Sequence, residues 1–246
     1  MKAKQNASMG SNLTGLAASG ERAEEMQEGM EEFPPTSSGS THGPAVVRVL
    51  YAREGGTIGS VPPPSGITGK AKAVAKKLAG GEPTLFMDKL GERLVFERTG
   101  TRLYEALVSK HEAWGTFEGG PSRDDLVEIL NDEHAHFMLL CDVVEELGGD
   151  PTAMTPSADL AATISEGLLK VLTDPRTTLL QCLEAILVAE LTDVSSWEVL
   201  TQLANDVGEE ELAQQFEEAQ ETEEEHLALV RNWLAIGQGR VDHAAE

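Results

Sequence analysis

The chain has 246 residues, of which 40% are hydrophobic and 25% are charged, so it is long enough for one sizeable core and too apolar for a fully disordered protein. No run approaches the roughly 20 apolar residues that a membrane helix needs. The N-terminus also lacks the apolar block of a secretory signal peptide. The two cysteines, Cys141 and Cys182, form no Cys-x-x-Cys motif, which argues against a disulfide framework, a zinc finger and a rubredoxin-type iron site. We therefore expect no membrane association and a reducing, cytoplasmic location.

The formal net charge of −23 is unevenly distributed along the chain. Residues 1–81 carry nine Lys/Arg against seven Asp/Glu, whereas residues 82–246 carry ten against 35. A surface as acidic as the second part repels phosphate backbones, so we expect no nucleic-acid partner. The same surface attracts cations, although acidity alone does not define a metal site.

The first 81 residues predict a largely irregular extension. Residues 1–43 are rich in Gly, Ser and Glu, which predicts a disordered tail with at most a frayed helix over 21–32. Residues 44–81 predict an extended arm, in which the apolar run Ala45–Tyr51 favours a strand or extended segment. A short basic helix is expected over 69–79. This positive arm would dock onto an acidic body or remain a solvated tail.

Residues 82–238 have long helical periodicity, and residues 239–246 form a short C-terminal tail. Apolar residues recur at steps of three and four along four segments, each interrupted or followed by glycine. The four stripes run from Leu90 to His111, Leu126 to Leu147, Leu179 to Ala204 and Leu212 to Trp233. No convincing strand competes with them, so the main body is predicted to be all-α.

The lengths of the connections predict the topology. Short connections join the first helix to the second and the third to the fourth, as between antiparallel neighbours. Residues 149–176 separate the second helix from the third and contain an expected short helix over 157–172. Such a connection can climb a helix of about 40 Å at about 1.5 Å per residue. The prediction is a four-helix bundle with one long crossover between the second and third helices.

Each apolar stripe contains a glutamate near its middle. These glutamates are Glu97, Glu133, Glu190 and Glu223. Burying a lone carboxylate costs several kcal/mol, so four in one layer require shared positive charge. His136 follows Glu133, and His226 follows Glu223, at i+3 on the same helix face. Two divalent cations would balance four carboxylates, and oxygen-rich ligation with one imidazole per ion suits iron or manganese.

The order of these residues is more informative than any single motif. Two Glu-x-x-His motifs are weak evidence alone, because glutamate is common in this chain and about one such motif is expected by chance. The complete order, Glu, Glu-x-x-His, crossover, Glu, Glu-x-x-His, is much less expected by chance than the two motifs alone. The glutamates are 36 residues apart in the first half and 33 in the second, and Tyr104 and Trp197 each follow a glutamate at i+7. The chain therefore reads as two copies of one helical hairpin.

This pattern resembles the ferritin-like superfamily of di-iron and di-manganese carboxylate proteins, which includes rubrerythrins, bacterioferritins and manganese catalases. The segments that carry the resemblance are Phe96-Glu97-Arg98, Asn131-Asp132-Glu133-His134-Ala135-His136, Val188-Ala189-Glu190-Leu191 and Glu223-Glu224-Glu225-His226. The resemblance implies bridging roles for Glu133 and Glu223, terminal roles for Glu97 and Glu190, and one metal each for His136 and His226. It also implies two iron ions, with manganese possible, that react with dioxygen or peroxide in iron handling or oxidative-stress defence. The electron donor is not identified, and we expect a homo-oligomer, with a dimer favoured.

Some features depart from individual families of that superfamily. Rubrerythrins have extra carboxylates near the third-helix ligand, and here Asp193 is the one nearby candidate. Tyr104 is expected to be a core aromatic residue or a redox or proton relay beside the site. The long N-terminal extension argues against a 24-subunit storage cage. The alternative function is a non-enzymatic helical assembly module, which would hold no stoichiometric metal.

Overall fold

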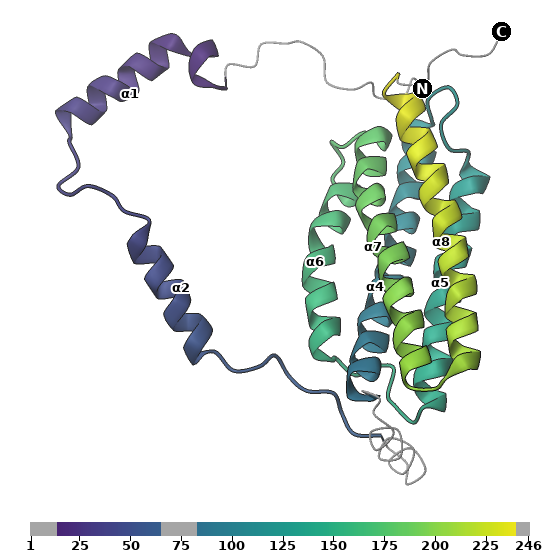
Figure 1. Cartoon of the computed structure of the whole chain (residues 1–246). Coiled ribbons are helices and arrows are strands. Elements are labelled where there is room, and N and C mark those ends of the chain that lie inside the picture. Colours follow the sequence, from purple (N-terminus) through teal and green to yellow (C-terminus); the bar gives the residue numbers. More distant parts are fainter. Residues whose placement is uncertain (1–13, 65–82, 240–246) are drawn as a thin grey trace. The chain divides into compact units, whose positions relative to one another are not determined.

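The computed structural model describes residues 14–64 and 83–239, and every regular element within these residues is helical (Figure 1). The described residues divide into two compact units, one within residues 14–57 and the other within residues 58–64 and 83–239. The short basic helix expected over 69–79 lies outside the described residues. No helix in the described part is long and apolar enough to cross a membrane.

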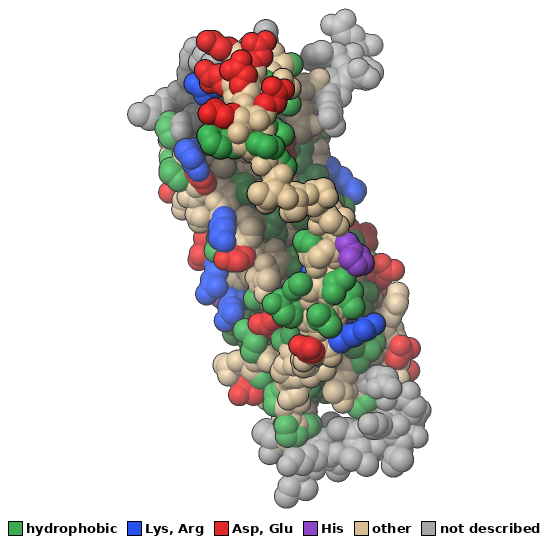
Figure 2. All heavy atoms as spheres, turned by 90° about the vertical axis from the view of Figure 1, so that its left-hand side faces the viewer, with side chains coloured by type: hydrophobic (Ala, Val, Ile, Leu, Met, Phe, Trp, Pro, Cys, Tyr) green, Lys and Arg blue, Asp and Glu red, His purple; other side chains and the backbone are tan. Residues whose placement is uncertain are grey.

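The described part of the N-terminal unit contains one short 3-10 helix and two α-helices, none of which has buried residues. A short 3-10 helix, Leu16–Ala18, precedes α1, Gly20–Glu32, which lies where a frayed helix was expected. Helix α2 spans His42–Glu54, so the expectation of a strand or extended segment over Ala45–Tyr51 was wrong. An isolated strand leaves its backbone groups without partners, whereas a helix pairs them internally. Figure 2 shows acidic side chains gathered on α1 and hydrophobic side chains on α2.

The second unit contains the predicted four-helix bundle. Its long helices are α4, Pro83–Trp114; α5, Arg123–Glu146; α7, Leu179–Asp206; and α8, Glu210–Gly237. Helix α6, Pro156–Thr173, forms the crossover and packs against α4 and α7. Helices α5 and α7 start at the same end of the bundle, as the crossover prediction required (Figure 1).

Local sequence signals account for the starts of three helices. Ser122 accepts a hydrogen bond from the backbone N–H of Asp125, and the Asp125 side chain accepts one in return, which makes a capping box at α5. Thr178 caps α7 by the same arrangement, with Gln181 as its partner. Thr155 caps α6 immediately before a proline. These caps fix where each helix begins and hence the level at which its buried residues lie.

The bundle core consists of two apolar clusters with a polar layer between them. One cluster contains Leu103, Leu126, Ile186 and Val230 among its buried members, and the other contains Leu90, Leu140, Trp197 and Phe216. Burial of each large apolar side chain stabilises the fold by about 1.5–3 kcal/mol. These clusters support the bundle on both sides of a layer that contains buried charged groups.

Candidate metal centre

All six predicted ligand side chains meet in the polar layer between the two apolar clusters. Glu97 comes from α4, Glu133 and His136 from α5, Glu190 from α7, and Glu223 and His226 from α8. Each is buried, and the most accessible of them, His136, is only 8% exposed. Because every stripe places its glutamate at the middle of its helix, packing the four helices brings the carboxylates to one level.

The ligand atoms form two overlapping groups, each with its atoms within 4.8 Å of one another. The first group, called position A, consists of Glu97, His136 and Glu223. The second, called position B, consists of Glu133, Glu190, Glu223 and His226. Glu223 belongs to both groups, so the geometry provides room for two adjacent cations that share one carboxylate.

Both histidines contact the shared glutamate. His136 Nδ1 lies 2.7 Å from Glu223 Oε1, and His226 Nδ1 lies 3.2 Å from Glu223 Oε2. Burial alone would raise the pKa of the Glu223 carboxyl, but hydrogen bonds from the two histidines hold this pKa at about 2. Burial lowers the pKa of His226, but its hydrogen bond to Glu223 outweighs that effect and raises the pKa to about 9. His226 is therefore a cationic partner of Glu223 in the metal-free protein. Burial lowers the pKa of His136 as well, but its hydrogen bond to Glu223 again outweighs that effect and raises this pKa.

Two other carboxyl groups of the layer, Glu190 and Glu133, hold their protons more tightly than ordinary carboxyls. Burial, followed by the charge of Glu223, raises the pKa of Glu190 to about 8. The same two causes raise the pKa of Glu133. Glu97 Oε2, Glu133 Oε2 and Glu190 Oε2 are buried without hydrogen-bond partners among the described residues. Orphaned carboxylate oxygens are costly in a protein interior, so this donor set fits cations that would replace the missing partners.

Two polar contacts orient the ligands of position B. Asp132 Oδ2 lies 3.3 Å from His226 Nε2, on the ring nitrogen opposite the one that contacts Glu223. A carboxylate in this place fixes the orientation and tautomer of a metal-binding imidazole. The Tyr104 hydroxyl donates a hydrogen bond to Glu190 Oε1. Burial, and next the Glu190 charge, raise the pKa of Tyr104 well above its ordinary value, so the phenol keeps its proton.

A buried arginine lies beside position A. Arg93 is 2% exposed, and its Nε lies 2.8 Å from Glu97 Oε1. Its Nη2 forms an ion pair with Asp193, which is also fully buried. Asp193 belongs to neither ligand group and is instead the partner of Arg93. Sequence reasoning missed Arg93 and Asp132, although Arg93 stands one helical turn before Glu97 and Asp132 directly precedes Glu133.

Gly100 creates the space that the Glu133 carboxylate occupies. A Cβ atom on Gly100 would lie 1.9 Å from Glu133 Oε2, a distance that no real contact allows. The Glu133 carboxylate can therefore take this position only because residue 100 lacks a side chain. The spacing rule for apolar stripes did not reveal this requirement.

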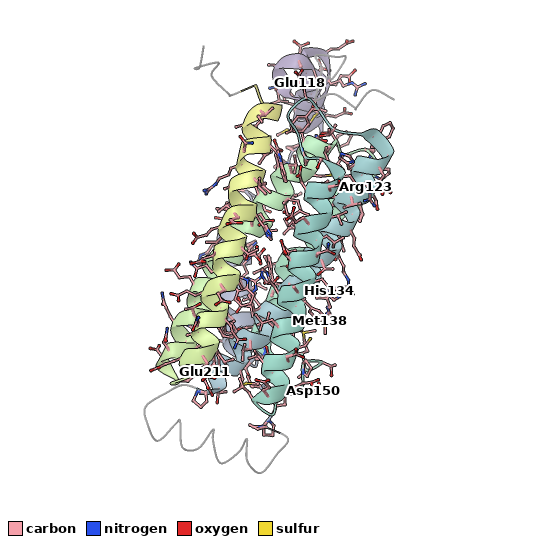
Figure 3. The ribbon with its side chains drawn as sticks, turned by 90° about the vertical axis from the view of Figure 1, so that its right-hand side faces the viewer. Glu118, Arg123, His134, Met138, Asp150 and Glu211 are labelled. Atoms are coloured by element: carbon pink, nitrogen blue, oxygen red, sulfur yellow. The ribbon has the colours of Figure 1, made fainter. Side chains whose placement is uncertain are left out.

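The other histidine of α5, His134, lies off the site. His134 is exposed, and Figure 3 shows it near Met138 on the outer surface of α5, on the side of the bundle formed by α5 and α8. Met138 is 45% exposed. The i+3 spacing from Glu133, rather than i+1, therefore selects the inward-facing imidazole.

Comparison with known proteins supports the ferritin-like resemblance of the bundle. Residues 126–238 match the family model of the ferritin-like domain. This match confirms the ferritin-like resemblance. The matched stretch contains α6 to α8 and nearly all of α5, and thus five of the six predicted ligands; Glu97 on α4 precedes it. No curated protein and no solved structure matches the chain.

Proposed function

We propose that this chain is a ferritin-like dinuclear metal protein that reacts with dioxygen or peroxide. The observation that carries the proposal is the convergence of four buried glutamates and two histidines into two groups that share Glu223. We propose iron as the metal, with manganese possible, because oxygen ligands with one imidazole per ion suit both and no thiolate is present in either group.

Charge balance favours a metal centre over a helical module that only mediates assembly. The four glutamates of the layer are each at most 1% exposed. Burial of a carboxylate without a compensating charge costs several kcal/mol. A module that only mediates assembly would gain nothing from keeping four such carboxylates in its core. Two divalent ions would neutralise the four glutamates and satisfy their orphaned oxygens. An assembly module would be expected to place such residues on its surface.

The residues of the site have separable roles in this proposal. Glu97 and His136 would hold an ion at position A, and Glu190 and His226 would hold one at position B. Glu223 would bridge the two, and the family resemblance assigns a second bridging role to Glu133. The ions would supply the electrons that reduce dioxygen or peroxide. The two apolar clusters would exclude bulk water, and Tyr104 would hold a proton beside Glu190, where it can serve as a redox or proton relay.

The reaction class that we propose is oxidation of iron(II) or reduction of peroxide, in iron handling or oxidative-stress defence. We further propose a cytoplasmic homo-oligomer, with a dimer favoured. Its acidic bundle surface would disfavour nucleic acids as partners, since the formal net charge is −23.

Anaerobic titration with iron(II) tests the proposal directly. We expect saturation near two ions per chain, followed by oxidation of the bound iron when dioxygen or peroxide is added. Glu225→Ala serves as a control for the loss of a carboxylate outside the site, because Glu225 is exposed and stands two residues from Glu223 on the same helix. This variant should still bind two ions per chain. Saturation at one ion, or no saturable binding, would exclude a dinuclear centre. Bound zinc or copper would not identify the native metal, since intrinsic affinities favour both over iron and manganese.

A further inference from the structure

We propose that Arg93 is a built-in counter-cation that makes position A the weaker and exchangeable one of the two metal positions. The inference rests on the proposed dinuclear function and adds an order of filling: position B first, position A second. It follows from a contact that only one of the two ligand groups has. Glu97, which serves position A alone, is already paired with the Arg93 guanidinium.

The guanidinium is held in place from several sides. Its Nη2 forms an ion pair with Asp193, and its Nε lies 2.8 Å from Glu97 Oε1. Its central carbon lies 4.7 Å from the ring centroid of Phe96 and 5.7 Å from that of Trp197. Stacking on aromatic rings favours arginine over lysine at such a site. A guanidinium keeps its proton at every relevant pH, so this positive charge is permanent.

A cation at position A must therefore compete with a charge that is already present. It needs Glu97, His136 and Glu223, and the first of these is paired with Arg93. The incoming ion is also repelled by the guanidinium, and repulsion between charges a few ångströms apart is strong in a poorly solvated interior. Position A thus gains less from Glu97 than the ligand count alone suggests.

Among the described residues, none of the three glutamates of position B is paired with a permanent cation, and the proton that His226 carries is released when an ion binds. Position B offers four ligand residues instead of three, and Glu190 is paired with the neutral Tyr104 hydroxyl rather than with a cation. Asp132 adds a carboxylate behind His226. All three differences favour a cation at position B over one at position A.

The structure also provides partners for Arg93 when an ion takes over Glu97. A polar pocket of about 100 Å³ opens between α4 and α7 and is lined by Lys89, Glu92, Arg93, Ser195, Ser196 and Val199. Arg93 Nη1 is buried and has no hydrogen-bond partner among the described residues. Water in this pocket can solvate the guanidinium, and Asp193 can keep its ion pair with it. Filling and emptying of position A can then occur without unfolding the layer.

Stepwise loading of the unmodified protein is the first test. Co(II) serves as the probe, added at one equivalent per chain to metal-free crystals and located by anomalous scattering. We expect the ion at the group formed by Glu133, Glu190, Glu223 and His226. An ion at the group containing Glu97, or equal occupancy of both, would overturn the inference. This arm requires no substitution and so does not depend on the folding of a variant.

Calorimetric titration of two variants with Co(II) is the second test. The double variant Arg93→Leu/Asp193→Leu removes the pair without changing net charge, and a buried ion pair replaced by apolar residues commonly leaves stability unchanged or higher. We expect its second binding step to tighten by about tenfold or more, equivalent to about 1.4 kcal/mol. Asp193→Asn leaves Arg93 fully available to Glu97, so the second step should weaken. The first step should change little in both variants.

Tyr104→Phe is the matched control, because it removes a hydrogen bond at Glu190 and leaves Arg93 intact. It should affect the first step and spare the second. Two equal steps in the unmodified protein, or an unchanged second step in the double variant, would refute the role of Arg93 while leaving the dinuclear function intact. Failure of the unmodified protein to bind two ions would instead refute the dinuclear function itself.

Discussion

The two helical hairpins of the bundle, α4–α5 and α7–α8, carry the same ligands but place them in different surroundings. Arg93 precedes Glu97 by four residues in the first hairpin, and Ile186 precedes Glu190 by four residues in the second. Gly100 follows Glu97 by three residues, and Asp193 follows Glu190 by three residues. Both members of the Arg93–Asp193 pair thus occupy repeat positions whose counterparts carry no charge.

The residues around the Glu-x-x-His motifs differ in the same way. Asp132 contacts His226 across the bundle, whereas Thr222, at the equivalent position of the second hairpin, donates to Glu218 O of its own helix. Tyr104 and Trp197 are equivalent and each reaches the opposite hairpin, but Tyr104 bonds to Glu190 while Trp197 packs on His136, with ring centroids 5.5 Å apart. The repeat specifies which residues meet, and its deviations make the two positions unequal.

The largest expected effect comes from the equivalent glutamates Glu133 and Glu223. Glu223→Ala should abolish binding of both ions, because Glu223 belongs to both ligand groups, and should destabilise the metal-free protein by removing the anion between two imidazoles. Glu133→Ala should also lose the dinuclear centre. It should leave the metal-free protein as stable or more stable, because burial and the charge of Glu223 raise the pKa of Glu133.

Metal analysis after anaerobic iron(II) loading, circular dichroism and thermal melting of the metal-free forms measure these effects. Helical content should be largely retained in both variants. A Glu223→Ala protein that still holds two ions would show that the shared ligand is misassigned. A marked loss of metal-free stability in Glu133→Ala would show that Glu133 has a structural role.

The second prediction concerns the pH dependence of the metal-free protein. The pKa of Glu190 is raised from 4.5 to about 8, and that of His226 from 6.5 to about 9. Between the unfolded-state and folded-state pKa of each group, the folded protein binds more protons than the unfolded protein. The free energy of unfolding should therefore fall as the pH rises from about 5 to about 9. The lowered pKa of Glu223, about 2, reduces stability only below pH 4.5.

Thermal melting in the presence of a chelator, followed from pH 5 to pH 9, tests this slope. Glu190→Gln should flatten the decline up to about pH 8, because the titrating group is removed. Saturating metal should remove or reverse the slope, since ligands lose their protons when ions bind. A metal-free melting temperature that rises across this range would contradict the proposed protonation of the layer.

The third prediction uses two helical glycines of unequal surroundings. Gly100→Ala would place a Cβ atom 1.9 Å from Glu133 Oε2, so the carboxylate must move and about one ion per chain should be lost. Gly167 on α6 is exposed, and a Cβ atom added there would have nothing within 4 Å, so Gly167→Ala should stabilise the protein by about 0.5–1 kcal/mol and keep both ions. Denaturant unfolding and metal analysis of both variants provide the comparison. Full metal retention in Gly100→Ala would show that the carboxylate has room to shift.

The sequence predicted the helices, the crossover and the six converging side chains because helical periodicity and an internal repeat are local patterns. It did not predict Arg93, since a charged residue on a helix is ordinarily solvated and only the packing of α4 against α7 reveals its burial. Asp132 was missed because its partner, His226, is 94 residues away. The α2 segment was misjudged because an apolar run of seven residues fits a strand or a helix equally well until its neighbours are known.

The smallest expected effect comes from Asp132, the residue that contacts the outer ring nitrogen of His226. Asp132→Ala removes the carboxylate that contacts His226 Nε2 at 3.3 Å, so the imidazole at position B loses its orienting partner. We expect metal affinity at this position to fall by about 10–100-fold, the usual consequence of losing such a contact. Thr222→Ala is the matched control from the other hairpin, and it should change affinity little because Thr222 donates to its own helix. Equal effects of the two substitutions, measured by titration with Co(II), would show that the hairpins support their histidines alike and that position B does not owe its strength to Asp132.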